Sequence, residues 1–254
     1  EEAAAQGIIA GINAAMLVKG EEPLVLKRSE AYIGVLIDDL VTKGTQEPYR
    51  IMTSRAEYRL LLRQDNADLR LTEYGRRVGL VSDARYARFQ AKKAEIEQTM
   101  AQLRQTALTP NADMQQKMAA LKTGELRTVT TLFDLLRRPE VNYAAVREVF
   151  GLPKISPAAE QQIDTAITYE GYIRKQQEQV DHMEKLEMKL LPENMDYQQV
   201  PSLRDEAREK LSKIRPRSVG QAGRISGVSP ADVSVLLVYL EQQRRQKERK
   251  NELS

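Results

Sequence analysis

Hydrophobic residues recur at helical spacing through most of the chain, and the clearest example lies at residues 83–105. Its apolar positions follow one another at intervals of three, four and seven, which places them on one face of an α-helix. They are Tyr86, Phe89, Ile96, Met100 and Leu103. Ser82 precedes this segment, and serine is a favoured N-cap residue. The pattern predicts a helix over Asp83–Gln105 that packs through a single apolar stripe.

The same signals predict a series of further helices with few strands between them. Thr109-Pro110 begins one helix, Asn142 caps Tyr143–Phe150, and Ser156-Pro157 opens the longest, which runs to about Leu190. We expect at most one or two short strands, near the N-terminus, with Pro23–Lys27 as the candidate. The sequence therefore predicts a mainly all-α fold built as a multi-helix bundle.

The segment from residue 191 onward carries the clearest local pattern. Ser218 and Gln221 fit an S-x-x-Q capping box, and Ser229-Pro230 opens a second helix after a tight turn. This predicts a small helix-turn-helix-like subdomain. Because the exposed positions of Ala231–Tyr239 carry no basic residue, partner docking or core closure is favoured over reading of a DNA groove. The basic end, Gln242–Lys250, is expected to be a solvated helix end.

We therefore expect three parts: an Arg-rich segment to residue 70, a helical bundle over 71–190 and the small subdomain at 191–254. Glu1–Val18 is predicted to be a helix that is apolar on nearly every side, which is typical of a helix inside a larger fold. Three glycines in predicted helices would allow another backbone to approach closely. They are Gly7, Gly11 and Gly171.

Composition limits the chemistry that these 254 residues can perform. There is no Cys and a single His, His182, which excludes Cys- or His-based zinc clusters and disfavours a Ser-His-Asp site. Adjacent Asp38 and Asp39 point apart on a helix, so a paired or solvated role is favoured over a metal site. No apolar run reaches the ~18 residues of a membrane span. The net charge of +3, from 39 basic and 36 acidic residues, means that any basic surface must be local.

Such a local concentration of charge lies in Glu47–Arg70, which we call the arginine segment. Arg55, Arg59 and Arg63 stand at i, i+4 and i+8, so a helix would place their guanidinium groups on one face. Arg50 and Arg70 flank them, and two tyrosines, Tyr49 and Tyr58, are interleaved. Planar cationic groups beside aromatic rings suit phosphates and stacked bases. The alternative is that these arginines are solvated or paired with acids elsewhere in the fold.

Several long segments resemble the glucose-inhibited division protein A family, also called MnmG or GidA. They are Glu1–Ala14, Tyr32–Arg70, Tyr169–Ile173, Leu191–Val200 and Arg217–Leu240. The resemblance implies an FAD-dependent enzyme that acts with a GTPase, MnmE, to install a carboxymethylaminomethyl or aminomethyl group at C5 of the wobble uridine of tRNAs. It further implies NADH and a folate-derived one-carbon unit as reactants, a homodimer when full-length, and a cytoplasmic protein without a membrane segment.

The resemblance also implies that this chain is the C-terminal part of that enzyme, with residues 1–70 closing the FAD domain. The sequence has no G-x-G-x-x-G turn, and the spacing of Gly220, Gly223 and Gly227 does not fit one. Neither catalytic residues, a metal site nor a cofactor bound to this fragment are therefore expected.

Site residues follow from the resemblance position by position. Those implied to face tRNA are Arg50, Arg55, Arg59, Arg63 and Arg70. Those implied to dock the GTPase are Arg217, Gln221 and Arg224. Glu1, Glu2 and Gln6 follow the flavin-contacting turn of the family, which is not in this sequence. Two hypotheses stay open: a module that binds tRNA and the partner, or a purely structural module that docks the partner while tRNA is held elsewhere. An autonomous enzyme is disfavoured, because no base, nucleophile or metal cluster can be assembled.

Overall fold

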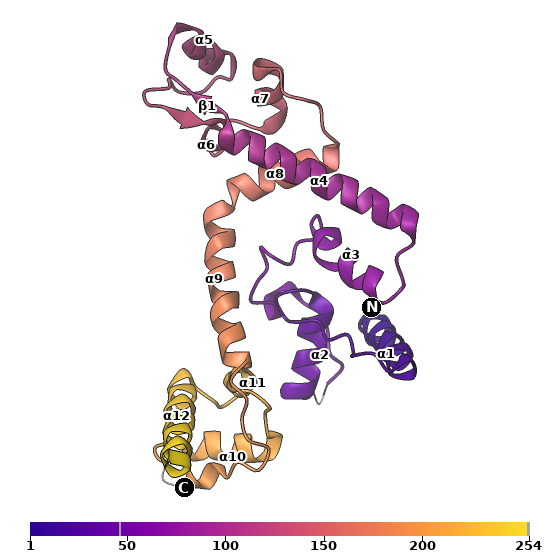
Figure 1. The fold of residues 1–254 in the computed structure, drawn as a ribbon, viewed down its shortest axis with the longest axis vertical. Helices are drawn as coiled ribbons and strands as arrows, with labels where there is room; N and C mark the ends of the chain where they lie inside the picture. The colour runs from indigo at the N-terminus through magenta and orange to yellow at the C-terminus, as the bar shows by residue number, and fades with distance from the viewer. Residues whose placement is uncertain (46, 253–254) are drawn as a thin grey trace. The chain divides into compact units, whose positions relative to one another are not determined.

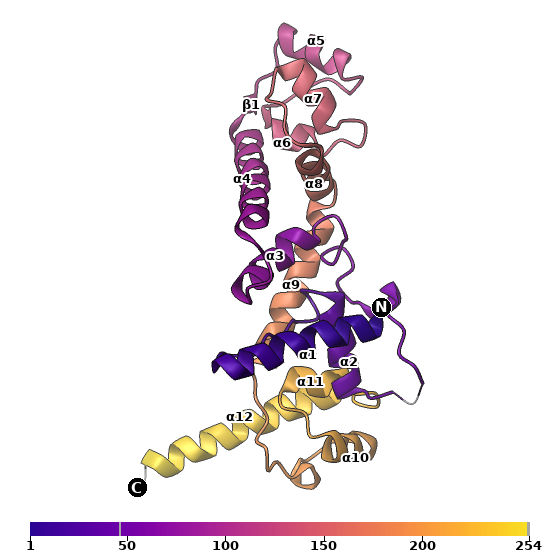
Figure 2. The same ribbon diagram turned by 90° about the vertical axis from the view of Figure 1, so that its right-hand side faces the viewer.

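The computed structural model describes residues 1–45 and 47–252 and is mainly helical, which confirms the mainly all-α prediction (Figures 1 and 2). The helices are α1 (Glu2–Lys19), α2 (Tyr32–Thr42), η1 (Thr53–Arg55), α3 (Ala67–Arg77), α4 (Asp83–Gln105), α5 (Ala112–Ala120), α6 (Leu132–Leu135), α7 (Tyr143–Phe150), α8 (Pro157–Thr168), α9 (Glu170–Glu187), η2 (Tyr197–Gln199), α10 (Asp205–Ile214), α11 (Val219–Arg224) and α12 (Pro230–Glu252). The strands are β1 (Ala107–Leu108) and β2 (Thr130–Thr131).

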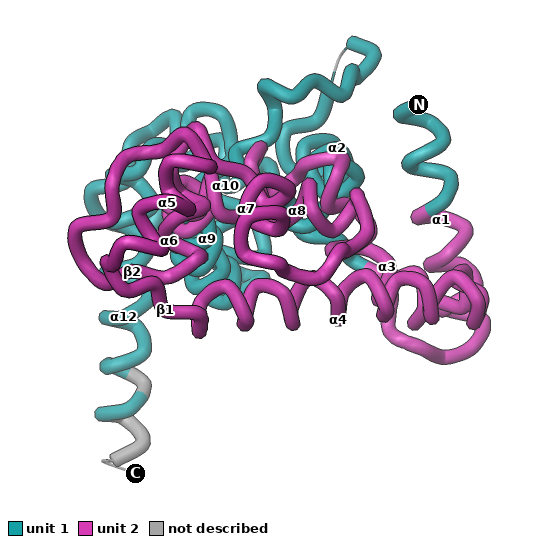
Figure 3. Tube along the Cα trace, turned by 90° about the horizontal axis from the view of Figure 1, so that it is seen from above, with its two compact units in different colours: residues 1–8, 25–58, 177–254 teal, residues 9–24, 59–176 magenta. Residues whose placement is uncertain are grey.

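The chain forms two compact units, each built from separate stretches of sequence (Figure 3). Unit 1 contains residues 1–8, 25–58 and 177–254, and unit 2 contains residues 9–24 and 59–176. The three-part division at residues 70 and 190 stays a prediction. The last two residues of its third part, 253 and 254, lie outside the described residues.

Unit 2 is centred on the long helix α4, which packs against α6 and α8 while α3 lies against its other end (Figure 1). The predicted bounds of α4 and α7 are confirmed, and so are their N-caps: Ser82 and Asn142 each accept a hydrogen bond from the backbone N–H three residues on. The helix expected from Thr109-Pro110 begins later, because Asn111 is its N-cap. Leucines dominate the buried core of this unit, so packing of apolar stripes stabilises it.

The strands lie in the middle of the chain and not near the N-terminus. β1 pairs antiparallel with β2, with Ala107 opposite Thr131. The strand expected for Pro23–Lys27 does not form. The side-chain amide of Asn13 instead makes two hydrogen bonds to the backbone of Leu24. It donates to the carbonyl oxygen of Leu24 at 3.1 Å and accepts from the N–H of Leu24 at 2.7 Å. One side chain thus supplies what a neighbouring strand would have supplied.

The longest predicted helix is divided in two. The chain leaves regular helix at Tyr169, so α8 ends at Thr168 and α9 begins at Glu170. This break places Gly171 in the first turn of a new helix, and a Cβ atom there would meet nothing within 4 Å. Gly7 and Gly11 in α1 are equally open. The close backbone approach expected at these glycines is therefore wrong, and α1 keeps most of its apolar side chains exposed.

The C-terminal part of unit 1 has its own core beneath α10, α11 and α12, formed by residues between 191 and 240. Ser218 caps α11 by accepting from the N–H of Gln221 at 3.0 Å. The Gln221 side chain accepts from the N–H of Arg217 at 2.8 Å, not from that of Ser218, so only half of the predicted capping box forms. The end of α12 extends beyond α10 and α11 (Figure 2), and the side chains of Lys247 and Lys250 in the basic end lie outside the described residues.

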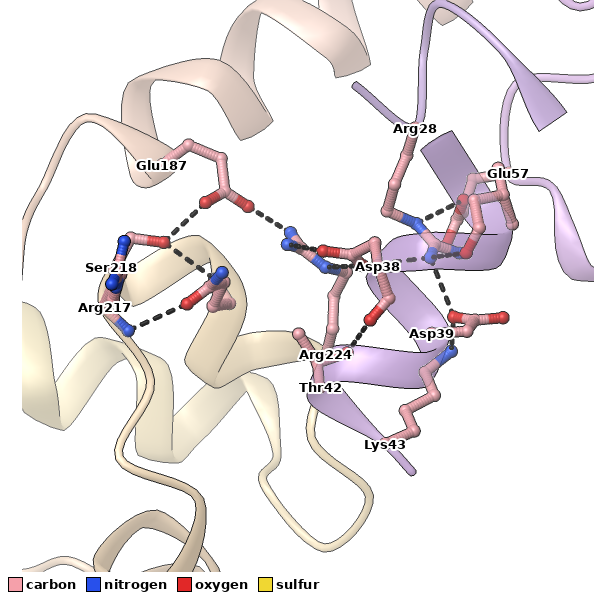
Figure 4. A network of polar contacts seen from close by, with 12 residues as sticks. Arg28, Asp38, Asp39, Thr42, Lys43, Glu57, Glu187, Arg217, Ser218 and Arg224 are labelled. Carbon is pink, nitrogen blue, oxygen red and sulfur yellow. Dashed lines mark hydrogen bonds and ion pairs between the residues drawn. The ribbon is translucent and has the colours of Figure 1, made fainter. Parts of the chain in front are cut away.

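A group of charged side chains connects distant segments of unit 1, and we call it the charge network (Figure 4). Its members are Arg28, Asp38, Asp39, Glu57, Glu187 and Arg224. Arg28 is only 8% exposed, and its guanidinium lies 2.8 Å from Asp39, 3.0 Å from Asp38 and 2.7 Å from Glu57. It also donates to the carbonyl oxygen of Arg55 at 3.2 Å. A single buried side chain thus fixes α2 and the arginine segment together.

Arg224 extends the charge network to the C-terminal helices. Its Nε and Nη2 atoms each lie 2.8 Å from an oxygen of Asp38, a bidentate pair. Its Nη1 donates to Glu187 of α9, which also accepts from the hydroxyl of Ser218. Asp38 and Asp39 are therefore paired, as the sequence indicated, and α2, α9 and α11 of unit 1 meet through their charges.

The charge network shifts the acid–base behaviour of its members. Burial alone would lower the pKa of Arg28, but the hydrogen bonds and charges of Glu57 and Asp39 outweigh it and raise the pKa. Burial would raise the pKa of Asp39, yet hydrogen bonds from Lys43, Tyr49 and Arg28 hold it below its usual value. Burial and the bond to Asp39 raise the pKa of Tyr49 to about 12. Both shifts favour the charged forms of Arg28 and Asp39, so this ion pair stays charged at neutral pH.

One prediction concerns the close contact between α2 and the segment before it. In Gly34→Ala, the new Cβ atom would lie 2.3 Å from the carbonyl oxygen of Lys27 and 2.6 Å from that of Leu26. Because both atoms belong to the backbone, the free energy of unfolding should fall by about 1–3 kcal/mol in a denaturant titration. Gly171→Ala, in an open helical position, is the control and should raise it by about 0.4–1 kcal/mol. Equal effects would contradict the close contact at Gly34.

A second prediction tests the charge network. Arg28→Met removes the cation between three carboxylates and should lower the free energy of unfolding by about 3–5 kcal/mol. Arg28→Lys should not restore it, because one ammonium group cannot reproduce the planar set of donors. Arg244→Met, which removes exposed ion pairs on α12 in the same unit, should change it by less than about 1 kcal/mol. A small loss in Arg28→Met, equal to that of the control, would show that the network contributes little.

Candidate nucleic-acid interface

The arginine segment is not the helix that its spacing predicts. Between residues 51 and 66 the only helical turn is η1, which ends at Arg55, and α3 begins at Ala67. Ala56 and Tyr58 are buried on alternate positions, which is the period of extended chain, and the carbonyl oxygen of Arg55 bonds to Arg28. The prediction of one helical face with Arg55, Arg59 and Arg63 is therefore wrong, because tertiary contacts override the local spacing.

Arg50 and Arg55 belong to unit 1 and are both exposed. The Arg55 guanidinium lies over the ring of Tyr49, 4.3 Å from its centre, and its Nε donates to the carbonyl oxygen of Arg50 at 3.0 Å. Tyr49 is held in turn by its hydroxyl, which donates to Asp39 of the charge network at 2.7 Å. Arg55 has no carboxylate partner in the part of the chain that the structure describes. Arg55 is thus an exposed cation that stacks on a tyrosine ring held in place by Asp39.

Arg59 belongs to unit 2, is exposed, and has no hydrogen bond or ion pair from its side chain within the described ranges. Arg63 is mostly buried: its Nε contacts both oxygens of Asp65, at 3.1 and 3.2 Å, and its guanidinium reaches the carbonyl oxygen of Leu60. Arg70 donates to Asn66 and to the carbonyl oxygen of Arg63. In this unit Arg59 is free to meet a ligand, whereas Arg63 and Arg70 hold their own loop in shape.

Two glutamines that the sequence did not single out hold this loop in unit 2. Gln162 of α8 is buried, and its amide donates to the backbone oxygen of Asp65 at 2.6 Å and to its carboxylate at 2.7 Å. Gln176 of α9 accepts from the N–H groups of Leu60 and Leu61, at 3.1 and 3.3 Å. The signal for Gln162 was present in the sequence, since a glutamine there stands beside apolar positions on the inner face of α8.

The three residues implied in partner docking differ in their surroundings. Arg217 is exposed, and its backbone carbonyl accepts from the N–H of Leu191 at 2.9 Å. The Gln221 side chain is engaged with the N–H of Arg217. Arg224 is mostly buried in the charge network, with pairs to Asp38 and Glu187. The structure thus leaves Arg217 accessible and places Arg224 in an internal role.

Glu1, Glu2 and Gln6 do not form a cofactor site by themselves. A Glu2 carboxylate oxygen accepts from the N–H of Ile51 at 2.8 Å and lies 3.4 Å from Arg50, and the bond from Ile51 is the main reason that the pKa of Glu2 is lowered. Gln6 donates to the backbone of its own helix. No Gly-rich phosphate-binding turn accompanies them in the sequence. By themselves, these three residues therefore do not fit FAD.

Residues 1–45 and 47–252 contain neither a metal-binding cluster nor a membrane-spanning helix. No group of three or more potential metal ligands is present among these residues. None of the described helices is long and apolar enough to cross a membrane.

Two family models match the chain, and together they cover most of its helices. Residues 83–177 match the C-terminal helical domain of the tRNA modifying enzyme MnmG/GidA. Residues 179–254 match the C-terminal helical bundle of the same enzyme. The two matches meet within α9, at almost the same residue where the two compact units divide.

Curated relatives give the same result over nearly the whole chain. It is 57% identical over 246 residues to the tRNA uridine 5-carboxymethylaminomethyl modification enzyme MnmG of Caldicellulosiruptor saccharolyticus, covering 96% of this chain and 39% of that protein. It is 58% identical over 251 residues to the MnmG of Heliobacterium modesticaldum, again covering 96% of this chain and 39% of the relative. The chain thus spans about two fifths of the length of these relatives.

Solved structures show the same architecture. GidA of Aquifex aeolicus in its form II crystal superposes with a TM-score of 0.76 at 41% identity, over 94% of this chain and 38% of that one. The form I crystal gives a TM-score of 0.74 at 40% identity. Together with the two family models, these likenesses establish that the chain belongs to the MnmG/GidA family of tRNA-modifying enzymes, of which it forms the C-terminal helical part.

Proposed function

We propose that this chain is the tRNA-binding and partner-docking region of an enzyme that modifies C5 of the wobble uridine. The observation that carries the proposal is the exposure of Arg55 and Arg59 without carboxylate partners among the described residues. Most other arginines of the same segment and network are paired inside the protein. An unpaired, exposed guanidinium group is available to a phosphate, and tRNA offers phosphates in quantity.

The rest of the proposed activity lies outside these residues. The full-length protein would use FAD, NADH and a folate-derived unit, act as a homodimer in the cytoplasm and work with a GTPase of the MnmE type. This rests on the family relationship, since the chain spans 39% of its curated relatives. In this proposal the helical region binds and positions the tRNA, and the rest of the full-length protein supplies the reactive groups.

The proposal predicts how tRNA affinity responds to salt. In the full-length protein, Arg55→Ala and Arg59→Ala should each weaken tRNA binding and reduce the slope of log K against log salt by about one unit, because each removes one phosphate contact. Arg63→Ala is the control: its side chain is engaged by Asp65, so it should lower stability without changing the slope. Titrations at several salt concentrations measure all three.

The same titration separates the two open hypotheses. If neither exposed arginine changes the slope, the arginine segment does not contact tRNA. If the GTPase then still binds normally, the region is the purely structural docking module, with tRNA held by the rest of the enzyme. Reduced slopes in both variants would support tRNA binding by this region.

We propose docking of the GTPase at the joint between α9 and α11 in unit 1. Met188 and Leu190 leave their side chains 81% and 71% exposed, and Leu190 pairs by a β-bridge with Ser218, the residue after Arg217. Exposed aliphatic side chains beside an exposed arginine are typical of a protein interface. Of the three residues implied in partner docking, Arg217 is thus the one that lies on this surface and is accessible to the GTPase.

A paired substitution tests this docking surface. Leu190→Asp should weaken binding of the GTPase by at least about tenfold, because it places a charge in an apolar contact, while tRNA affinity is unchanged. Val129→Asp, at a similarly exposed valine of unit 2, should leave GTPase binding unchanged. Equal binding by both variants in a pull-down with the full-length protein would exclude this surface.

A further inference from the structure

Two tyrosines at the start of α9 are exposed without a structural role of their own. Tyr172 is 65% exposed and Tyr169 is 43% exposed. Neither side chain makes a hydrogen bond or a ring contact with any described residue. Tyr172 lies in the first turn of α9, and Tyr169 lies at the break just before it, where its carbonyl oxygen accepts from the N–H of Ile173 at 2.9 Å. Two exposed aromatic rings three residues apart offer two flat apolar surfaces.

The loop that carries Arg59 is attached to the same side of α9. Gln176, one helical turn after Tyr172, accepts hydrogen bonds from the N–H groups of Leu60 and Leu61. Residues four apart share a helix face, so Tyr172 and Gln176 lie one above the other. Arg59 directly precedes Leu60 and is itself exposed. All of these residues belong to unit 2, so the backbone next to Arg59 is fixed to the turn of α9 that follows Tyr172 within one compact body.

The surroundings of the tyrosine pair are basic. Glu170, beside Tyr169, lies 3.4 Å from the guanidinium of Arg104 and 3.9 Å from that of Arg137. Asp134 also pairs with Arg137, at 3.7 Å. Lys175 is exposed one turn after Tyr172. With Arg59 included, the four basic side chains outnumber the two acidic ones, which favours a polyanion at this surface.

We propose that Tyr172 and Tyr169, together with Arg59, form a stacking surface for unpaired bases of the bound RNA. The inference rests on the proposed tRNA binding and adds to it a class of contact, because phosphates are met by arginines and bases by aromatic rings. An apolar protein partner fits less well, because the side chains that flank the rings are charged or amide groups.

Substitution of Tyr172 in the full-length protein separates stacking from charge. Tyr172→Leu should weaken binding of a tRNA transcript by about tenfold, in the range measured for loss of one stacked base. The slope of log K against log salt should stay unchanged, because no charge is removed. Tyr172→Phe keeps the ring and should bind tRNA like the unaltered protein. The melting temperature should not change, since the side chain has no partner in the fold.

A second RNA sharpens the test. A blunt-ended RNA duplex with the same number of phosphates offers no unpaired bases, so Tyr172→Leu should bind it as the unaltered protein does. Unchanged affinity of Tyr172→Leu for tRNA, while Arg59→Ala still reduces the salt slope, would overturn the stacking surface and leave the proposed function in place. Loss of GTPase binding with tRNA binding intact would overturn it as well, by assigning the surface to a protein. If Arg55→Ala and Arg59→Ala also keep their slopes, the proposed function fails together with this inference.

Discussion

The fold of unit 1 depends on the burial of Arg28 among carboxylates. Taking a guanidinium group and several carboxylates out of water is unfavourable unless each charge finds its partners with good geometry. The charge network meets that requirement only when α2, the segment around Glu57 and α11 are all in place. The exposed Arg55 of this unit is built on the same arrangement. Tyr49 is the link, because it is held by Asp39 and in turn orders Arg55.

Helices formed by local signals could be predicted from the sequence, and segments fixed by distant contacts could not. α4 and α7 have the bounds that apolar spacing and their N-caps predict. The arginine segment has equally regular spacing, yet residues 56–66 form no helix, because burial of Tyr58 and the bond between Arg28 and the Arg55 carbonyl decide the conformation there. A spacing of four in a run of charged residues carries less information than the same spacing among apolar ones, since only the latter reports what packs inside.

In the candidate site, too, the sequence identified the residues but not their contacts with distant parts of the chain. The sequence pointed to the arginines as a set, and the structure separates them by partner: Arg63 has Asp65, whereas Arg59 has none among the described residues. What distinguishes them is a carboxylate two residues away and the amide of Gln162, almost a hundred positions along the chain. Residue type alone does not show which arginine will have such partners. Exposed and engaged arginines look alike in sequence, and so do most glutamines in helices.

The bidentate pair of Arg224 with Asp38 joins residues 186 positions apart, with residues 59–176 of unit 2 between them in the chain. During synthesis the segment with α2 leaves the ribosome long before its guanidinium partner exists. At about 5–20 residues per second the delay is on the order of 10–40 s. Over that interval the inserted helices can acquire their own core, while Asp38 has Arg28 beside it but still lacks Arg224. Folding of unit 1 is therefore completed late. A nascent chain that stalls before α11 would expose the incomplete unit 1 to chaperones and proteases.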